Sequence, residues 1–380
     1  MIDGRGLARR AWERWLANPR PLDRIVGQLV RESGASAAAS ADAWLTVGAA
    51  ARTAGWLAAH RDPTGWFAAD LADVRRRIAD IPGFWRALDN PPDRSAWRRG
   101  SPAEAVAAAG VAPWWTEPLV RRFGSDLPRF LAALDEAPPL WIRARKADEV
   151  PGLEASLRAE GFAVRRGSPL ALAVRGQRPI STTQGYRDGA FEVQDLASQQ
   201  VVDLLPIGKG PVWDACAGEG GKSLALAGRL GGRSAVCASD VAPWRLEQLR
   251  RRVRRAGWQN VRTFAWDGAG TPVLPREASR GFPLVLVDAP CSASGTWRRN
   301  PEVRLGPPAS ADLLALVAAI LRNAAAAVAP GGVLALSTCS IDHRENEGQL
   351  AQLGLRGGEA GCHGSPDLDA DTLFLGLVLV

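Results

Sequence analysis

Hydrophobic positions in the second half of the chain follow two alternating spacings. Short apolar runs typical of buried strands occur at Val212–Asp214, Ser234–Ser239, Val261–Ala265, Leu284–Val287 and Val333–Ser337. Apolar residues at three- and four-residue spacing, typical of helices, lie between or after them at 221–230, 243–256 and 311–328. Strands that alternate with helices predict an α/β fold with a doubly wound parallel sheet of the Rossmann type. We expect Leu373–Val380 to close this sheet as an edge strand.

The first 137 residues show helical spacing only. Apolar residues recur three and four positions apart in Arg24–Arg31, Ala41–His60, Trp66–Ile81 and Asp126–Leu134. These segments are separated by the helix-breaking residues Pro63, Pro82-Gly83 and Pro91-Pro92. The pattern predicts an all-helical N-terminal domain over residues 1–137.

The pattern changes between residues 138 and 178. Strands are expected at Leu140–Ala144, Phe162–Val164 and Leu170–Val174, with a helix at Val150–Glu160. This order predicts a small α+β module of the RNA-recognition type, although its strands lack the aromatic residues that stack on bases. Residues 179–380 then form a third domain, in which a helix at Phe191–Leu205 precedes the predicted sheet.

Composition limits the kind of protein this can be. The chain has 46% hydrophobic residues, 23% charged residues and no apolar run of about twenty residues, so we expect a soluble protein without a membrane span. Nothing at the N-terminus has the apolar core of a secretion signal. The five cysteines and three histidines show no zinc-ligand spacing, so we predict a cytoplasmic protein without a metal site.

The net charge of +7 favours a polyanionic partner such as RNA. Arginine carries nearly all of this charge, because lysine occurs only at 146, 209 and 222. A GC-rich genome would also enrich arginine, so both explanations remain open. The dense run of arginines at 250, 251, 252, 254 and 255 is either a solvated helix face or a contact to an RNA backbone. Ten of the 15 tryptophans lie before residue 142, where they either fill a helical core or form a stacking surface.

A glycine-rich turn follows the first strand of the predicted sheet. Gly218, Gly220 and Gly221 let the backbone bend tightly and approach a ligand closely. The spacing is neither that of a dinucleotide fingerprint nor that of a P-loop. The turn therefore predicts a cofactor site of another kind.

Carboxylates end the three strands that follow. Asp240 lies about twenty residues after the turn, where an acid meets ribose hydroxyls in such folds. Asp267 follows the third strand and Asp288 the fourth. Three acids would repel a pyrophosphate but suit a nucleoside that carries a cationic amino acid, so we expect S-adenosyl-L-methionine as the cofactor.

Two thiols follow two strands of the predicted sheet. Cys291 comes after Leu284–Val287 and Cys339 after Val333–Ser337, so both can face one cleft. Lys222 and the pair Arg298-Arg299 could supply the positive charge that activates a thiol. A thiolate that adds to carbon 6 of a pyrimidine makes carbon 5 nucleophilic, and a second group must then remove the proton from carbon 5.

These motifs together resemble the RsmB/NSUN family of RNA (cytosine-5)-methyltransferases, and its bacterial RsmB members above all. The resemblance covers residues 180–350 and lies in DACAGEGGKS at 214–223, Asp240, DAPCSASGTWRRNPE at 288–302 and STCSIDHRENE at 337–347. VQDLASQQVV at 193–202 resembles the helix before the cofactor turn of that family. Bacterial RsmB members methylate 16S ribosomal RNA and carry a NusB-like helical domain and a small linking module, which agrees with the predicted layout.

The resemblance implies a role for each motif residue. Cys339 would attack the cytosine, Cys291 would assist release of the product, and Asp288 and Lys222 would complete the catalytic set. The implied cofactor contacts are Cys216, Ala217, Gly218, Glu219, Gly220, Gly221, Lys222, Asp240, Arg245, Asp267 and Asp288. Next to the active turn, we expect Arg298 and Arg299 to contact RNA. We expect the protein to act as a monomer.

Two other functions stay open at this point. The same chemistry could act on transfer RNA instead of ribosomal RNA. Alternatively, the chain could be a non-catalytic RNA-binding or ribosome-assembly factor on the same fold. Loss of a catalytic thiol or of Asp288 would favour this last alternative, and neither loss is present.

Overall fold

The computed structural model describes residues 3–176, 178–270, 272, 276–354, 356–365 and 369–380. They form two compact units, each built from two stretches of the chain. The helical unit combines Met1–Pro138 with Ser292–Pro308, and the sheet unit combines Pro139–Cys291 with Ala309–Val380. The predicted three-domain division places Ser292–Pro308 with the catalytic domain, whereas in the structure this segment packs with the helices.

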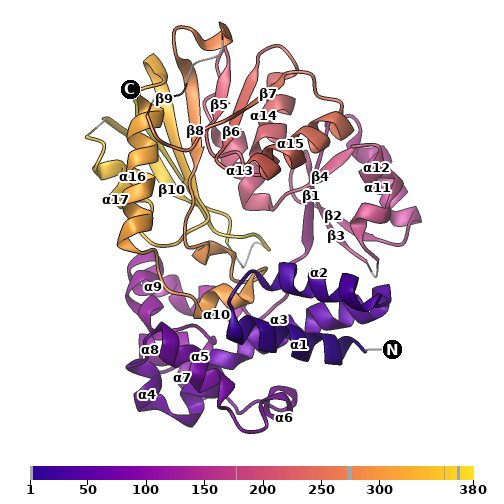
Figure 1. The fold of residues 1–380 in the computed structure, drawn as a ribbon, viewed down its shortest axis with the longest axis vertical. Helices are drawn as coiled ribbons and strands as arrows, with labels where there is room; N and C mark the ends of the chain where they lie inside the picture. The colour runs from indigo at the N-terminus through magenta and orange to yellow at the C-terminus, as the bar shows by residue number, and fades with distance from the viewer. Residues whose placement is uncertain (1–2, 177, 271, 273–275, 355, 366–368) are drawn as a thin grey trace. The chain divides into compact units, whose positions relative to one another are not determined.

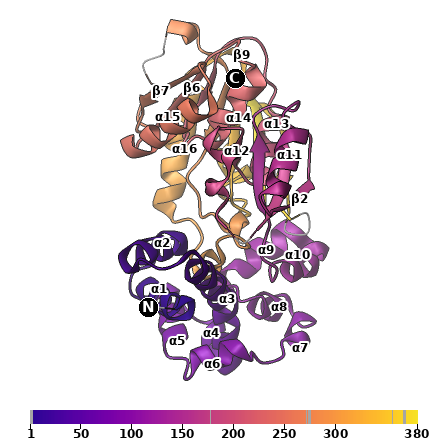
Figure 2. The same ribbon diagram turned by 90° about the vertical axis from the view of Figure 1, so that its right-hand side faces the viewer.

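The helical unit consists of short helices arranged around one long helix. This long helix is α3 (Ala37–Arg61), and α1 and α2 lie against it (Figure 2). The bounds of the other helices are α1 Gly4–Ala17, α2 Leu22–Ser33, α4 Pro63–Phe67, α5 Leu71–Ala79, α6 Phe84–Asp89, α7 Ser95–Arg98, α8 Pro102–Ala108, α9 Thr116–Phe123 and α10 Leu127–Ala133. The predicted helix Trp66–Ile81 is two helices, because Asp70 caps α5 by accepting a hydrogen bond from the Asp73 amide.

Most N-terminal tryptophans fill the core of this unit. Trp12, Trp56, Trp66 and Trp115 are almost completely buried. Trp12 stacks on Trp15, with ring centroids 5.0 Å apart. Burial of such large rings is a major source of stability in a small helical domain. The core interpretation of these residues is therefore confirmed.

A four-stranded antiparallel sheet opens the sheet unit. Its strands are β1 (Leu140–Ala144), β2 (Ala163–Arg166), β3 (Ala171–Arg175) and β4 (Phe191–Val193), in the order β2-β3-β1-β4. Helix α11 (Val150–Ala159) joins β1 to β2, and the short α12 (Gln184–Arg187) precedes β4. This element order is that of split β-α-β folds.

The predicted helix Phe191–Leu205 is wrong at its start. Residues 191–193 are β4, and helix α13 begins only at Leu196. Phe191, Glu192 and Val193 pair with Ala144, Arg143 and Ile142 of β1. Asp195 then caps α13, because its carboxylate accepts a hydrogen bond from the Ala197 amide. The cap, and not the apolar pattern, determines where the helix begins.

The larger sheet has seven strands, in the order β10-β11-β9-β8-β5-β6-β7. Their bounds are β5 Val212–Asp214, β6 Val236–Asp240, β7 Val261–Ala265, β8 Phe282–Asp288, β9 Val328–Thr338, β10 Arg356–His363 and β11 Leu373–Leu379. Strands β5 to β9 are parallel, whereas β11 runs antiparallel to both β9 and β10. A mostly parallel sheet in this order is Rossmann-like, so the predicted fold class is confirmed.

Helices cover both faces of this sheet (Figure 1). Helices α13 (Leu196–Leu204) and α14 (Gly221–Leu230) share one apolar cluster with the sheet, and α16 (Ala311–Ala325) shares another. Helix α15 (Pro243–Ala256) packs against β6, and the short α17 is Glu347–Ala351. The predicted edge strand Leu373–Val380 is an inner strand, because β10 pairs with its outer side.

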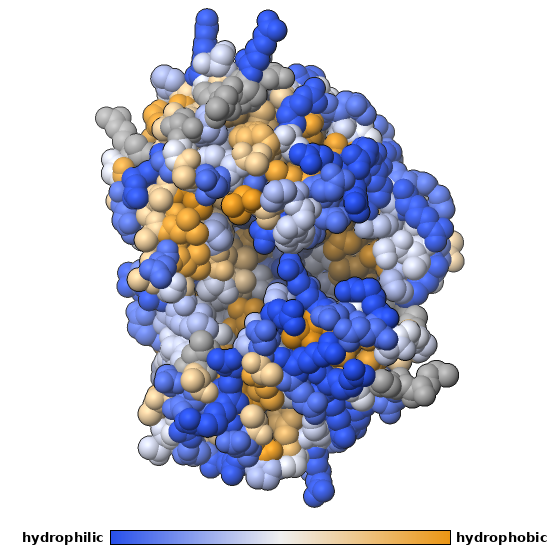
Figure 3. Space-filling view, viewed as in Figure 1, coloured by the Kyte–Doolittle hydropathy of each residue, from blue (hydrophilic) through white to orange (hydrophobic). Residues whose placement is uncertain are grey.

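Hydrophilic residues dominate the face of the molecule shown in Figure 3. An apolar patch lies over α16, where Leu316 is exposed. Within the described part of the chain, no helix is both long enough and apolar enough to cross a membrane.

Candidate active site

The glycine-rich turn connects β5 to α14 at the carboxyl edge of the parallel sheet. Gly220 has φ 88°, and a Cβ there would lie 2.0 Å from a methyl carbon of Leu249. Only glycine fits this position without strain. A Cβ on Gly218 or Gly221 would meet nothing within 4 Å, so the outer side of the turn is open. This open backbone surface suits the close approach of a ligand.

Asp240 holds the turn from the end of β6. One oxygen of its carboxylate accepts a hydrogen bond from the Gly218 amide at 3.0 Å, and the other accepts from the Ala242 amide at 2.8 Å. The Arg245 guanidinium lies 3.7 Å from the same carboxylate. Because a carboxylate has about four acceptor positions, Asp240 can still accept hydrogen bonds from ribose hydroxyls.

The other predicted cofactor contacts occupy the same edge. Ala217 donates its amide to the Ser239 carbonyl, and the Glu219 carbonyl accepts from Arg252. Asp267 is exposed after β7, where it accepts a hydrogen bond from the Ala269 amide. Burial, together with neighbouring carboxylates, raises the pKa of the Cys216 thiol, so this cysteine stays protonated and is no nucleophile.

An ion pair joins the cofactor turn to the end of β8. The Lys222 ammonium donates a hydrogen bond to the Asp288 carboxylate at 2.8 Å. Burial alone would lower the pKa of Lys222, but Asp288 and the charge of a Cys339 thiolate outweigh burial and raise it. Lys222 therefore remains a cation within the electrostatic range of Cys339.

The two predicted catalytic thiols lie side by side. The Sγ atoms of Cys291 and Cys339 are 3.4 Å apart. Each cysteine follows one of the paired parallel strands β8 and β9, in which Asp288 lies opposite Ser337. This register brings Asp288, Cys291 and Cys339 together, as the sequence predicts. Two thiols beside a lysine–carboxylate pair can provide a nucleophile and a second proton acceptor.

The comparisons with known proteins agree with this geometry. Residues 202–357 match the family model described as 16S rRNA methyltransferase RsmB/F. The ribosomal RNA small subunit methyltransferase B of Xanthomonas campestris pv. campestris is 36% identical over 264 residues, which make up 68% of this chain and 60% of that protein. The methyltransferase F of Salmonella heidelberg is 31% identical over 193 residues, covering 50% of this chain and 38% of that protein. Residues 202–357 belong to the RsmB/F methyltransferase family.

Solved structures show the same fold at lower identity. The structure described as PH0851 has a TM-score of 0.75 and 21% identity, and the match covers 99% of each chain. A methyltransferase homologue from Pyrococcus horikoshii has a TM-score of 0.59 and 22% identity, with 73% of this chain and 98% of that chain covered. The chain spans 60% and 42% of the lengths of the Xanthomonas and Synechocystis relatives that it matches.

The loop after Cys339 in this RsmB/F segment is held by buried polar residues that sequence analysis missed. Ser340 Oγ donates to the Glu345 carboxylate, and Asn346 donates its side-chain amide to the Ser340 carbonyl at 2.8 Å. Asp342 is fully buried and forms an ion pair with Arg344. Such a network fixes the backbone that carries the Cys339 thiol. The sequence STCSIDHRENE could have indicated this network, because many polar residues directly follow a buried strand there.

The predicted RNA contacts Arg298 and Arg299 differ in the structure. Both belong to the segment that packs with the helical unit. Arg298 is 3% exposed, and its Nε donates to the Glu136 carbonyl at 3.1 Å. The structure therefore contradicts an exposed RNA contact at Arg298 and assigns it a packing role, whereas Arg299 is exposed.

The arginine run on α15 makes many contacts within the protein. Arg252 and Arg255 both pair with Glu192 of β4, at 3.0 Å and 2.5 Å. Arg251 and Arg254 lie near Glu247 of the same helix. Arg252 and Arg255 of the run thus connect α15 to the smaller sheet. Among the described residues, no group of His, Cys, Asp or Glu side chains could hold a metal ion.

Proposed function

We propose that this chain is an S-adenosylmethionine-dependent methyltransferase that modifies carbon 5 of a cytosine in small-subunit ribosomal RNA. The observation that carries this proposal is the Cys291–Cys339 pair, with Sγ atoms 3.4 Å apart at the ends of adjacent strands. The names of its relatives, small-subunit ribosomal RNA methyltransferases B and F, support the reaction class and the substrate.

The cofactor would occupy the open side of the Gly218–Gly221 turn. S-Adenosylmethionine supplies an electrophilic methyl group on a sulfonium. Asp240, at the end of β6, would accept hydrogen bonds from its ribose hydroxyls, and Asp288 would face its cationic end. The absence of side chains at Gly218 and Gly221 leaves the backbone free to contact it.

The protein residues would divide the reaction as follows. The Cys339 thiolate would add to carbon 6 of the cytosine, while Asp288 would hold a proton at ring nitrogen 3 and so neutralise the negative charge that develops there. Carbon 5 would then take the methyl group from the sulfonium, which leaves as a neutral thioether. The Cys291 thiolate removes the proton from carbon 5, the C–S bond breaks, and Cys339 leaves as a thiolate. Lys222 would keep Asp288 in place through their ion pair.

Trapping of the covalent intermediate tests these roles. Cys291→Ala should accumulate an RNA adduct that survives denaturing gel electrophoresis, because the methylated base cannot be released. Cys339→Ala should form no adduct, and Cys362→Ala, a substitution in β10, should turn over like the wild type. An adduct in the Cys339→Ala variant would overturn the assignment.

Cofactor binding can be tested separately by calorimetry. Asp240→Ala should weaken S-adenosylmethionine binding about ten- to a hundredfold, as expected for lost hydrogen bonds to a charged acceptor. Asp267→Ala should have a smaller effect, because this exposed side chain caps its own turn. Equal affinities for Asp240→Ala and the wild type would contradict the ribose role.

Bisulfite sequencing of total RNA, with and without the gene, identifies the substrate. One cytosine of 16S ribosomal RNA should lose its mark. A loss confined to transfer RNA would keep the chemistry and reject the ribosomal substrate. No loss in any RNA would favour the non-catalytic alternative.

A further inference from the structure

A cavity in the sheet unit lies apart from the catalytic thiols. It has a volume of about 440 Å³. Its walls come from the loop after β1, from β4, from one face of α14 and from the residues after α15. None of Cys291, Cys339, Asp288 and Asp240 lines it. Its volume is within the range of pockets that bind small organic groups.

The cavity has a basic entrance. Arg143, Arg145, Lys146 and Arg229 line it, against the two acids Asp148 and Glu192. Glu192 is already neutralised by its ion pairs with two α15 arginines. Lys146 is more than half exposed, and its ammonium lies 3.9 Å from Glu149. Arg143 pairs with Asp203 and Arg145 with Glu149, so Lys146 is the cation that can meet an anionic group in the cavity.

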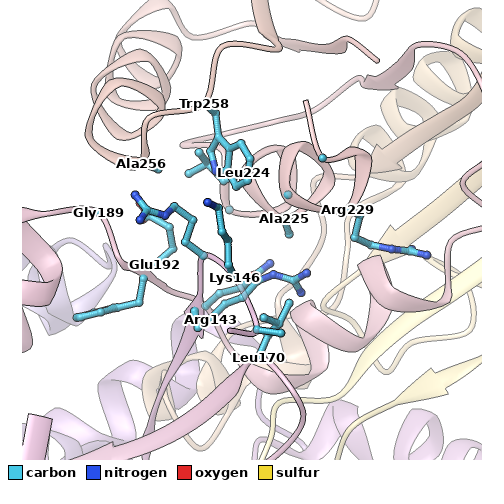
Figure 4. Close-up of a pocket in the computed structure, with 18 of the residues that line it drawn as sticks. Arg143, Lys146, Leu170, Gly189, Glu192, Leu224, Ala225, Arg229, Ala256 and Trp258 are labelled. Atoms are coloured by element: carbon cyan, nitrogen blue, oxygen red, sulfur yellow. The ribbon is translucent and has the colours of Figure 1, made fainter. Parts of the chain in front are cut away.

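The inner wall is apolar and aromatic. Figure 4 shows Lys146 extending toward Leu224 and Trp258, whereas Arg229 points away from them. The indole of Trp258 packs close to Gly228, where a Cβ would lie 3.4 Å from the ring. Leu170 and Ala256 complete the apolar lining. An aromatic ring beside an exposed cation is the combination that binds one base and one phosphate of a single strand.

We propose that this cavity binds a nucleotide of the substrate RNA outside the catalytic cleft, with its phosphate at Lys146 and its base against Trp258. The inference rests on the proposed function, because it assumes that the chain binds RNA. Gly221 lines the cavity and also begins α14, next to Lys222. A nucleotide held here would therefore anchor the RNA strand near the active site without contacting the reacting atoms.

The test is the binding of a short, fluorescently labelled single-stranded RNA to the full chain over a range of salt concentrations. Trp258→Leu keeps an apolar side chain but removes the stacking surface, and should weaken binding about tenfold. Lys146→Ala should reduce the slope of log affinity against log salt by about 0.7, the value for one phosphate contact to a single strand. Lys146→Glu should weaken binding further.

Lys209→Ala and Lys209→Glu are the matched controls. Lys209 is an exposed lysine outside the cavity, so these variants should bind like the wild type. At saturating RNA, the cavity variants should keep the wild-type kcat and show the loss in KM. Circular dichroism establishes whether Trp258→Leu folds, and the exposed Lys146 variants test the proposal independently of that.

The outcomes separate this inference from the proposed function. If the wild type methylates RNA but Lys146→Glu and folded Trp258→Leu bind it normally, the cavity is no RNA site and the inference is wrong. If the variants bind RNA more weakly but no cytosine is methylated, the RNA site stands and the proposed function fails.

Discussion

Asp214 is a buried carboxyl group at the start of the cofactor turn, and sequence analysis assigned it no role. It is fully buried at the end of β5 and accepts a hydrogen bond from Ser223 Oγ at 2.6 Å. Its other oxygen has no hydrogen-bond partner among the described residues. Burial, together with the charges of Asp288 and Asp240, raises its pKa to about 7 against the opposing hydrogen bond from Ser223.

This shift predicts a stability that falls as pH rises. The folded state holds the Asp214 proton more tightly than the unfolded state, so the stabilising contribution of this proton is complete below the unfolded pKa near 4. It is lost as pH rises through about 7. Between about pH 5 and pH 8, the wild type should lose roughly 3 kcal/mol of its free energy of unfolding through this group, and Asp214→Asn should not show this loss. Urea unfolding at both pH values measures it, with the exposed Asp267→Asn as control. Parallel pH profiles for the wild type and Asp214→Asn would contradict the prediction.

The thiol pair predicts sensitivity to peroxide. A disulfide needs sulfur atoms about 2.05 Å apart, so the 3.4 Å separation of Cys291 and Cys339 requires only a small movement. Peroxide would take two electrons and two protons from the thiols to form one S–S bond and two molecules of water. Activity should disappear and return with dithiothreitol, and mass spectrometry should detect the Cys291–Cys339 cross-link. In Cys291→Ala, adduct formation measures whether Cys339 can still react. Peroxide should also abolish adduct formation in this variant, but without producing the Cys291–Cys339 cross-link.

Among the elements, the turn between β5 and α14 depends on glycine at position 220. Gly220→Ala should lower the free energy of unfolding by about 1–3 kcal/mol and weaken cofactor binding, because it adds a Cβ at φ 88° against Leu249. For stability, Gly221→Ala is the matched control, since its Cβ would meet nothing within 4 Å. Thermal unfolding measures the loss of stability, and calorimetry of Gly220→Ala measures the loss of cofactor binding. Similar losses of stability in both variants would show that close approach of Leu249 is not the cause.

The elements also show how far the sequence predicts this fold. Strands β5, β6, β8 and β9 carry apolar residues and end in polar ones, so both their type and the convergence of Asp240, Asp288, Cys291 and Cys339 follow from the pattern. Strand β4 has three residues and directly precedes a helix, so its apolar positions merge with those of α13. Strand β10 was missed because its glycine-rich sequence has no alternating pattern.

Features that depend on contacts between distant residues could not be predicted from the sequence. The shifted pKa of Asp214 depends on complete burial, and the loop network of Ser340, Glu345 and Asn346 depends on which polar groups meet. Arg298 was predicted as an RNA contact from its position next to Cys291 alone. Its carbonyl acceptor at Glu136 is 162 residues away in the sequence, which no local pattern reveals.

At the scale of the whole molecule, the helical unit depends on a segment from the second half of the chain. Arg304 is fully buried there and donates hydrogen bonds to the carbonyls of Ala109, Leu134 and Trp297. Trp297 also packs edge-on against Trp115, with ring centroids 5.3 Å apart. Burial lowers the pKa of Arg304 to about 9, so at neutral pH it is a buried cation satisfied by backbone carbonyls.

Removal of this cation should therefore destabilise the helical unit. Arg304→Met leaves three buried carbonyls without their donor, and we expect a loss of about 2–5 kcal/mol. Hydrogen exchange should show faster opening of α8 and α10, which end near the carbonyl acceptors. Arg20→Met, at an exposed position, should change neither stability nor exchange. An unaltered exchange pattern in Arg304→Met would mean that these hydrogen bonds contribute little to the stability of the helical unit.

The discontinuous helical unit also has a consequence for synthesis on the ribosome. Its first 138 residues emerge early, but the segment that carries Trp297 and Arg304 emerges only after most of the sheet unit has been made. At about 5–20 residues per second, this delay is roughly 10–30 s. During that time Trp115 and the carbonyls of Ala109 and Leu134 lack their native partners from this segment. The N-terminal helices therefore stay incompletely packed until Trp297 and Arg304 have been synthesised.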